Sequence, residues 1–148
     1  MVARIQITNI NQVIAGLKAT DDAIEDAVKY AIGMAGLAVE RQAKQNASTG
    51  VHARGEGHIQ GTGPGPNVVT GNLRRSIKTE AKIGFGSSYI AEVSASAIYA
   101  YAVEKGLPEW GGVKYPYLEP AATTLRDNGT LSRVFITNFA TRLRGING

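Results

Sequence analysis

Residues 21–46, DDAIEDAVKYAIGMAGLAVERQAKQN, decide the fold. Acidic residues fill the first turns and basic residues the last, as the helix dipole favours, and Thr20 is placed to cap the start. We expect a single helix of about 26 residues, roughly 39 Å long. Its apolar face is defined by three- and four-residue spacing and consists of Ile24, Val28, Ala31, Ile32, Ala35, Ala38 and Val39.

Two glycines interrupt this helix, Gly33 and Gly36. Each weakens a helix by about 1 kcal/mol relative to alanine. Small residues at these positions therefore indicate that another backbone approaches closely. We expect the helix to pack on a sheet of the same chain, and a contact between subunits is the alternative.

Period-two alternation predicts the strands. Residues 2–8 form a first run, with Ala3, Ile5 and Ile7 on one face. Two further runs, joined by the glycine-containing turn at 84–87, predict a β-hairpin. Their inward faces are Ile77, Thr79, Ala81, Ile83 and Phe85, then Tyr89, Ala91, Val93 and Ala95. Residues 113–117, bounded by Pro116, predict a short fourth strand.

Shorter helices are expected at about 12–19, at 97–105 and after residue 118. Gly106 suits the end of the second, and Glu119 and Pro120 suit the first turn of the third. Residues 127–129 break that helix, and Thr130 can cap the last one, whose apolar stripe is Leu131, Val134, Phe135, Phe139 and Leu143. We predict one α+β domain over 1–148, with a short, mostly antiparallel sheet of about four strands. The long N-terminal helix and a C-terminal helix pack on one face of this sheet.

Composition and charge exclude several classes of protein. The chain has 148 residues and no cysteine, so it holds no disulfide, thiolate metal site or thiol nucleophile. A net charge of +4 is too mild to indicate a dedicated nucleic-acid binder. The first six residues lack the apolar region of a signal peptide, and no apolar run approaches the length of about 18 residues that a membrane helix needs. We expect a soluble protein kept in a cytosol-like compartment, without membrane contact.

Glycine marks an unusual segment. Seven of the 18 glycines lie within residues 50–71, and 48–69 show neither helical nor strand periodicity. Such a long gap in a small domain is typical of an inserted or binding loop. Its spacing fits neither a P-loop nor GxGxxG. His52 and His58, with Glu56 between them, are better explained as solvated residues than as metal ligands. We predict subunit contacts at Gly55, Gly57, His58, Gly61, Gly63, Arg74 and Arg75.

Catalytic patterns are absent from the sequence. Nothing fixes Glu92 and Glu104 as an acid–base pair, and there is no GxSxG elbow. We therefore expect no enzyme and no cofactor. The basic residues of stretch 74–82, Arg74, Arg75, Lys78 and Lys82, are interrupted by Glu80. They fit a solvated face, a contact with an acidic protein, or a nucleic-acid backbone.

Three segments in order resemble a known family. They are TGNLRRSI at 70–77, YAYAVEKG at 99–106 and PYLEPA at 116–121. Placed after a long helix, they resemble the small neck or tail-completion proteins of long-tailed bacteriophages. The matching residues are Thr70, Gly71, Leu73, Ser76, Ile77, Tyr99, Ala100, Val103, Glu104, Gly106, Leu118, Pro120 and Ala121.

These motif residues have plain physical roles. Gly71 can supply a positive φ at the end of the loop, and Leu73 and Ile77 can anchor the start of the following strand in the core. Tyr99, Ala100 and Val103 share one helical face. Glu104 can cap or pair locally, for instance with an arginine of a neighbour.

The resemblance implies a virion protein, assembled in the host cytoplasm, that forms a homo-oligomeric ring where head and tail join. Its partners would be the head-closure protein and the tail-terminator or tail-tube protein, with non-specific proximity to DNA in the channel. Two alternatives remain open. One is the tail-terminator ring that caps the tail tube, and the other is a small nucleic-acid-binding or regulatory domain that uses stretch 74–82. The family link between helix and T-G motif is shorter, so 48–69 departs from the family pattern.

Deleting Gly55–Gly65 tests the inserted loop. The shortened chain should fold, because the periodic segments lie outside the deletion, but it should assemble poorly. Circular dichroism would measure folding, and particle counts from a complemented mutant phage would measure assembly. Normal particle numbers would show that the loop is dispensable.

Overall fold

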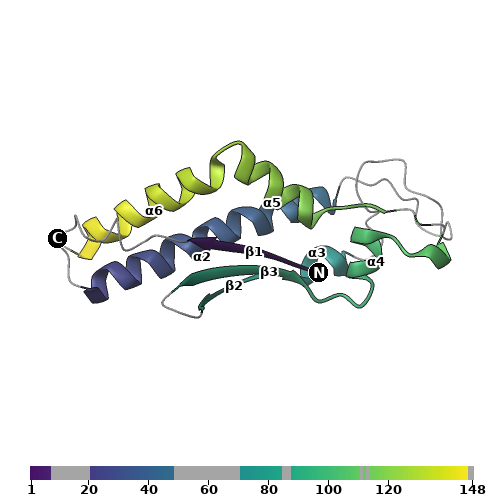
Figure 1. Cartoon of the computed structure of the whole chain (residues 1–148), viewed down its shortest axis with the longest axis horizontal. Coiled ribbons are helices and arrows are strands. Elements are labelled where there is room, and N and C mark those ends of the chain that lie inside the picture. Colours follow the sequence, from purple (N-terminus) through teal and green to yellow (C-terminus); the bar gives the residue numbers. More distant parts are fainter. Residues whose placement is uncertain (8–20, 49–70, 85–87, 111, 113, 147–148) are drawn as a thin grey trace.

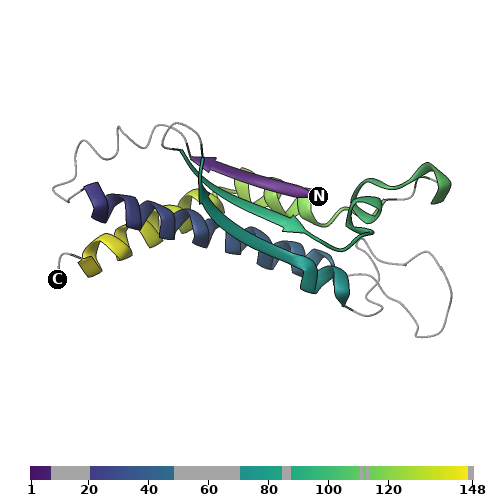
Figure 2. The same cartoon turned by 90° about the horizontal axis from the view of Figure 1, so that it is seen from below.

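The computed structural model describes residues 1–7, 21–48, 71–84, 88–110, 112 and 114–146 (Figure 1). The helix expected at 12–19, nearly all of the 48–69 loop, Thr20 and Phe85 lie outside these residues. The described elements form an elongated α+β domain in three layers, with α2 between the sheet and the C-terminal helices (Figures 1 and 2). The predicted fold class is confirmed.

The sheet has three antiparallel strands in the order β1-β3-β2. They are β1 (Val2–Ile7), β2 (Ile77–Ile83) and β3 (Tyr89–Ala95). Val93 of the central strand pairs with Ala3 on one side and Thr79 on the other. Ala91, Val93 and Ala95 are buried as the alternation predicted, so one face of the sheet meets the helices and the other is open.

Helix α2 (Asp21–Asn46) has the predicted bounds and 26 residues. Its start packs against α6, where Ile24, Ala27 and Val28 form a buried cluster with Leu143. Its second half packs against the sheet and α5, with Val39 and Ala43 in the main core. Because α2 is covered from two sides, it holds the three layers together.

Gly36 brings α2 close to the sheet. A Cβ atom there would lie 2.5 Å from Thr79 Cγ2 and 2.9 Å from Ala91 Cβ, closer than carbon atoms approach. The expectation of helix-on-sheet packing is therefore confirmed. At Gly33 the same added atom would lie 3.7 Å from Ala81 Cβ, an ordinary contact.

The predicted fourth strand is wrong, because the described residues 114–117 have no regular structure. Pro116 has no N–H to give to a neighbouring strand. The N–H of Tyr115 donates to the Val103 carbonyl (2.8 Å), and that of Tyr117 to the Glu104 carboxylate (2.8 Å). The segment is thus held by α4 rather than by the sheet.

The remaining helices are short except for the last. They are α3 (Asn72–Ser76), α4 (Ala100–Lys105), the 3₁₀ turn η2 (Pro108–Trp110), α5 (Leu118–Asp127) and α6 (Thr130–Ile146). Sequence periodicity gave no sign of α3, and α4 starts later than residue 97.

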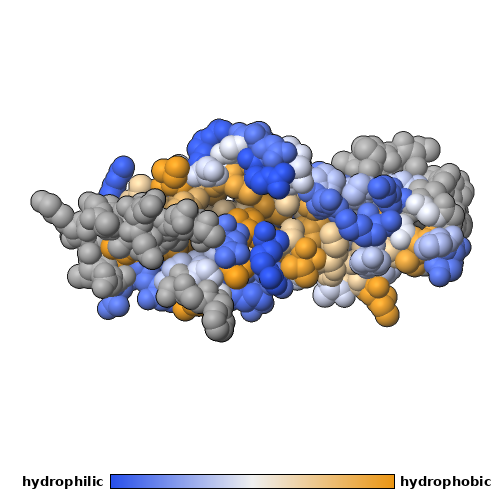
Figure 3. All heavy atoms as spheres, in the orientation of Figure 1, coloured by the Kyte–Doolittle hydropathy of each residue, from blue (hydrophilic) through white to orange (hydrophobic). Residues whose placement is uncertain are grey.

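The break between α5 and α6 is confirmed at 127–129, with Gly129 at φ 72°. Thr130 does not cap α6, however. Its own N–H donates to Asn128 Oδ1 (3.0 Å), so Asn128 supplies the acceptor. Hydrophilic side chains cover this junction in the space-filling view (Figure 3). Among the described residues, no helix has the length and apolar character that a membrane span needs.

Gly36→Ala and Gly33→Ala form a matched pair of variants. Gly36→Ala should destabilise the protein, because an overpacked core costs about 1–3 kcal/mol and outweighs the gain in helix propensity. Gly33→Ala should stabilise it by up to about 1 kcal/mol, because the added methyl fits and alanine favours the helix. Urea unfolding would measure both. The same change in stability for both variants would contradict the close approach at Gly36.

Candidate functional site

The three motif segments meet in one core. Leu73 and Ile77 come from the first segment, Ala100 from the second, and Tyr117, Leu118 and Ala121 from the third. All are buried, and they pack together with Val39 and Ala43 of α2 and with Ala47, which directly follows α2. Three segments that are far apart in the sequence therefore build a single site at the C-terminal end of α2.

The first segment turns the chain into the sheet. Gly71 has φ 71° and ψ 8°, a left-handed conformation that favours glycine. Its carbonyl accepts the N–H of Arg75 (3.0 Å), which closes the first turn of α3. The Ser76 hydroxyl donates to the Leu73 carbonyl (2.8 Å) and ends that helix. Leu73 and Ile77 thus anchor the start of β2, as expected.

The second segment contributes a buried carboxylate. Glu104, on α4, is only 1% exposed. Its Oε2 accepts the N–H groups of Tyr117 (2.8 Å) and Leu118 (3.0 Å), and its Oε1 accepts that of Glu119 (2.8 Å). These donors belong to the start of α5, where no side chain of the helix itself provides a cap.

Glu104 is therefore the N-cap of α5, supplied from another helix. The negative charge also faces the positive end of the α5 dipole. The expectation that Glu104 caps locally is confirmed. No cation of the described residues forms an ion pair with it, so the backbone donors are what offset the burial of this charge.

Tyr117 joins the cap to α2. Its side chain is fully buried, and its carbonyl accepts a hydrogen bond from Asn46 Nδ2 (3.0 Å). Its hydroxyl lies 3.5 Å from the Ala100 carbonyl, to which it donates. Burial raises the pKa of the Tyr117 phenol, and the nearby Glu104 carboxylate adds to this. Sequence reasoning missed Tyr117 and Asn46, although Tyr117 is the aromatic position of the third motif.

A cleft of about 340 Å³ opens beside the cap. The Glu119 carboxylate there pairs with Lys105. The hydrogen bond from Lys105 and its charge lower the pKa of Glu119, and the charge of Lys114 adds to this. Both lysines thus act on Glu119, while the Glu104 carboxylate is engaged by backbone N–H groups.

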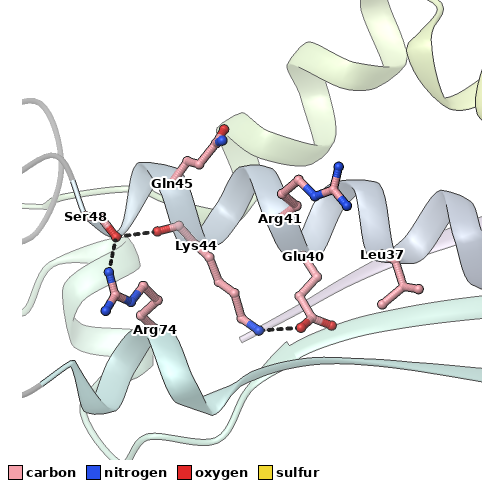
Figure 4. Close-up of a pocket in the computed structure, with 7 residues that line it drawn as sticks. All are labelled: Leu37, Glu40, Arg41, Lys44, Gln45, Ser48 and Arg74. Atoms are coloured by element: carbon pink, nitrogen blue, oxygen red, sulfur yellow. Dashed lines mark hydrogen bonds and ion pairs between the residues drawn. The ribbon is translucent and has the colours of Figure 1, made fainter.

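A second hollow, of about 580 Å³, lies between α2 and α3 (Figure 4). We call it the α2–α3 groove; its lining is Leu37, Glu40, Arg41, Lys44, Gln45, Ser48 and Arg74. Arg74 donates to Ser48 Oγ (3.2 Å), and Lys44 pairs with Glu40. Burial raises the pKa of Glu40, but the hydrogen bond from Lys44 and the charge of Lys44 help to outweigh this, so the pKa is lowered. Among the described residues that line it, three cations accompany one carboxylate, so this lining is positive.

The basic stretch 74–82 does not form one patch. Arg74 lies in the groove, and Arg75 donates to Asn72 Oδ1. Lys82 lies on the open face of the sheet, where it pairs with Glu92 (2.8 Å), which also binds Arg4 (3.3 Å). Glu92 and Glu104 therefore have separate partners and do not form an acid–base pair.

The other predicted site residues are placed as follows. Val103 packs on the core, whereas Tyr99 is 36% exposed. Gly106 ends α4 with φ 74°, and Pro120 is half-buried in the first turn of α5. Within the described ranges no cluster of three metal-ligating side chains occurs. The candidates that lie outside the described residues are Gly55, Gly57, His58, Gly61, Gly63 and Thr70, together with His52 and Glu56.

A family model matches residues 11–106, and its description is "Bacteriophage HK97-gp10, putative tail-component". The chain belongs to this HK97-gp10-like family. The match supports a structural, tail-related role in a bacteriophage virion, among other phage structural proteins. It includes α2, the sheet hairpin and α4, and it ends at Gly106, before α5 and α6. Neither the curated proteins nor the solved structures gave a match.

In this HK97-gp10-like protein, Glu104→Gln tests the cap. The amide keeps the size of the side chain but turns an NH₂ group toward backbone N–H donors. We therefore expect the free energy of unfolding to fall by about 3 kcal/mol. Glu119→Gln is the control. It removes an exposed carboxylate 15 residues later in the sequence but leaves the Glu119 backbone N–H in place, so stability should be nearly unchanged. Thermal unfolding of both would decide, and equal melting temperatures would contradict the cap.

Proposed function

We propose that this HK97-gp10-like protein forms a homo-oligomeric ring at the head–tail junction of the virion. It would contact the head-closure protein on one side and the tail-terminator or tail-tube protein on the other. The family match supports the tail-related part of this proposal. The order of the three motif segments, which resemble neck and tail-completion proteins, supports the finer assignment.

The observation that carries the proposal is the number of large apolar side chains left at the surface of a completed core. Ile98 is 99% exposed, Ile136 64%, Tyr101 58% and Ile83 56%. They belong to different elements, and apolar atoms reach the surface in several places in Figure 3. Separate apolar surfaces of this kind suit a subunit that is covered by neighbours on more than one side.

The sheet adds two further surfaces. Among the described residues, β1 and β2 each pair on one side only, so both outer edges have unpaired backbone groups. A ring uses heterologous contacts, in which one patch meets a different patch of the next copy. A subunit with two unlike edges and several unlike apolar surfaces meets that requirement.

The arrangement of charge supports a structural role over a regulatory one that uses stretch 74–82. A protein that binds the DNA backbone gathers its cations on one surface. Here Arg74 lies in the groove, while Lys82 is neutralised by Glu92 on the sheet face. Non-specific proximity to channel DNA is compatible with this pattern. We propose no catalytic role, because backbone N–H groups occupy the buried Glu104 carboxylate.

Removing the gene from the phage tests the function. We expect filled heads and separate tails, because the joining component is missing, and we expect plasmid-borne wild-type protein to restore whole particles. Electron microscopy of lysates and immunogold labelling of restored virions would measure this. Label at the junction is the expected result.

Two other outcomes would redirect the assignment. Tails of irregular, excessive length in the mutant would identify a tail terminator instead. Whole infectious particles without the protein would contradict any required place in the virion. Glu119→Gln protein serves as the complementation control, because it alters a charge without disturbing the core.

A further inference from the structure

The end of the molecule that carries α4 presents an apolar projection. Ile98 is 99% exposed, so its side chain touches almost nothing in its own chain. Tyr101 (58% exposed) and Tyr99 (36%) follow it on the same short segment. We call these three residues the α4 knob. Isoleucine and tyrosine exposed together are typical of residues that anchor protein interfaces.

The α2–α3 groove has the complementary character. Leu37, at one end of its lining, is 47% exposed. Figure 4 shows Leu37 pointing toward β2 and Arg41 pointing away from the Glu40–Lys44 pair. An apolar end followed by cations can receive an apolar side chain together with a carboxylate.

Each surface carries at least one charge that has no ion-pair partner among the described residues. Arg41 has no ion-pair partner among the described residues, and the same holds for Glu109 of η2. Glu109 is exposed and belongs to η2, which only two residues separate from the end of α4. The lysines at that end, Lys105 and Lys114, act on Glu119. Within the part of the chain that the structure describes, the knob end therefore carries a carboxylate without an ion pair, and the groove carries the Arg41 guanidinium without one.

We propose that the α4 knob of one copy of this chain inserts into the α2–α3 groove of the next copy, with Glu109 facing Arg41. The inference rests on the proposed ring and specifies its contact. Knob and groove are different patches, so the contact is heterologous and can repeat around a ring. The apolar knob provides the affinity, and the charge pair fixes the orientation.

Two surface variants separate the two halves of the contact. Ile98→Asp disables the knob, and Leu37→Asp disables the groove. Each alone should raise the dissociation constant roughly 30-fold or more, as expected for an interface hot spot. An equimolar mixture should form a dimer and nothing larger, because the Leu37→Asp chain still has a knob and the Ile98→Asp chain still has a groove.

Ser132→Asp on α6 is the control, since Ser132 is exposed, is polar and belongs to neither surface. Sedimentation velocity of wild type, the three variants and the mixture would give the size of each species. Circular dichroism melts confirm that all four chains fold.

A charge exchange adds a second readout. Arg41→Glu and Glu109→Arg should each weaken assembly about tenfold, and the double variant should restore most of it.

The outcomes distinguish this contact from the ring itself. A wild-type chain that assembles while Ile98→Asp and Leu37→Asp assemble equally well contradicts the contact and leaves the ring intact. A wild-type chain that stays monomeric at all concentrations contradicts both. If Leu37→Asp alone fails, and only in binding another virion protein, the groove receives a different partner and the proposed self-contact is wrong.

Discussion

The rest of this structure depends on the hydrogen bonds that the Glu104 carboxylate accepts. It joins α4 to α5 by accepting three backbone N–H groups at the start of α5. Without it those donors would lie unsatisfied near a buried core, and α5 would have no fixed start. The direction of α5 sets the path of the chain through Gly129 into α6, which covers the start of α2. One carboxylate thus determines where the C-terminal third of the chain lies.

The second constraint is the position of α2 between two layers. A helix covered from two sides needs small residues where the layers approach most closely, and Gly36 meets that need against Thr79 and Ala91. On its other side, Ile24, Ala27 and Val28 meet Leu143. These two contacts lie at different heights along the helix. Helix α2 therefore links the sheet, which precedes Glu104 in sequence, with the helices that follow it.

Local patterns in the sequence predicted most of the helices and strands. The features that the sequence mispredicted depend on contacts between residues far apart in the chain. The bounds of α2 and the faces of β1 and β3 follow from periodicity. Residues 113–117 alternate like a strand in sequence, but the N–H groups of Tyr115 and Tyr117 bond to α4, which no local pattern records. Thr130 and Asn128 are both good caps, and the turn at Gly129 decides between them. The motif indicated that Glu104 caps something, and only the fold brings Tyr117 to it.

The motif residues and the surfaces available for assembly are largely separate. Leu73, Ile77, Ala100, Leu118 and Ala121 are buried in the subunit, so none of them can touch a neighbour without unfolding. Their role is to hold the frame on which exposed residues are carried. Tyr99 and Tyr101 flank the buried Ala100, and Arg74 follows the buried Leu73. A motif that fixes the buried positions therefore fixes the exposed ones as well, because adjacent residues on a short helix cannot move independently.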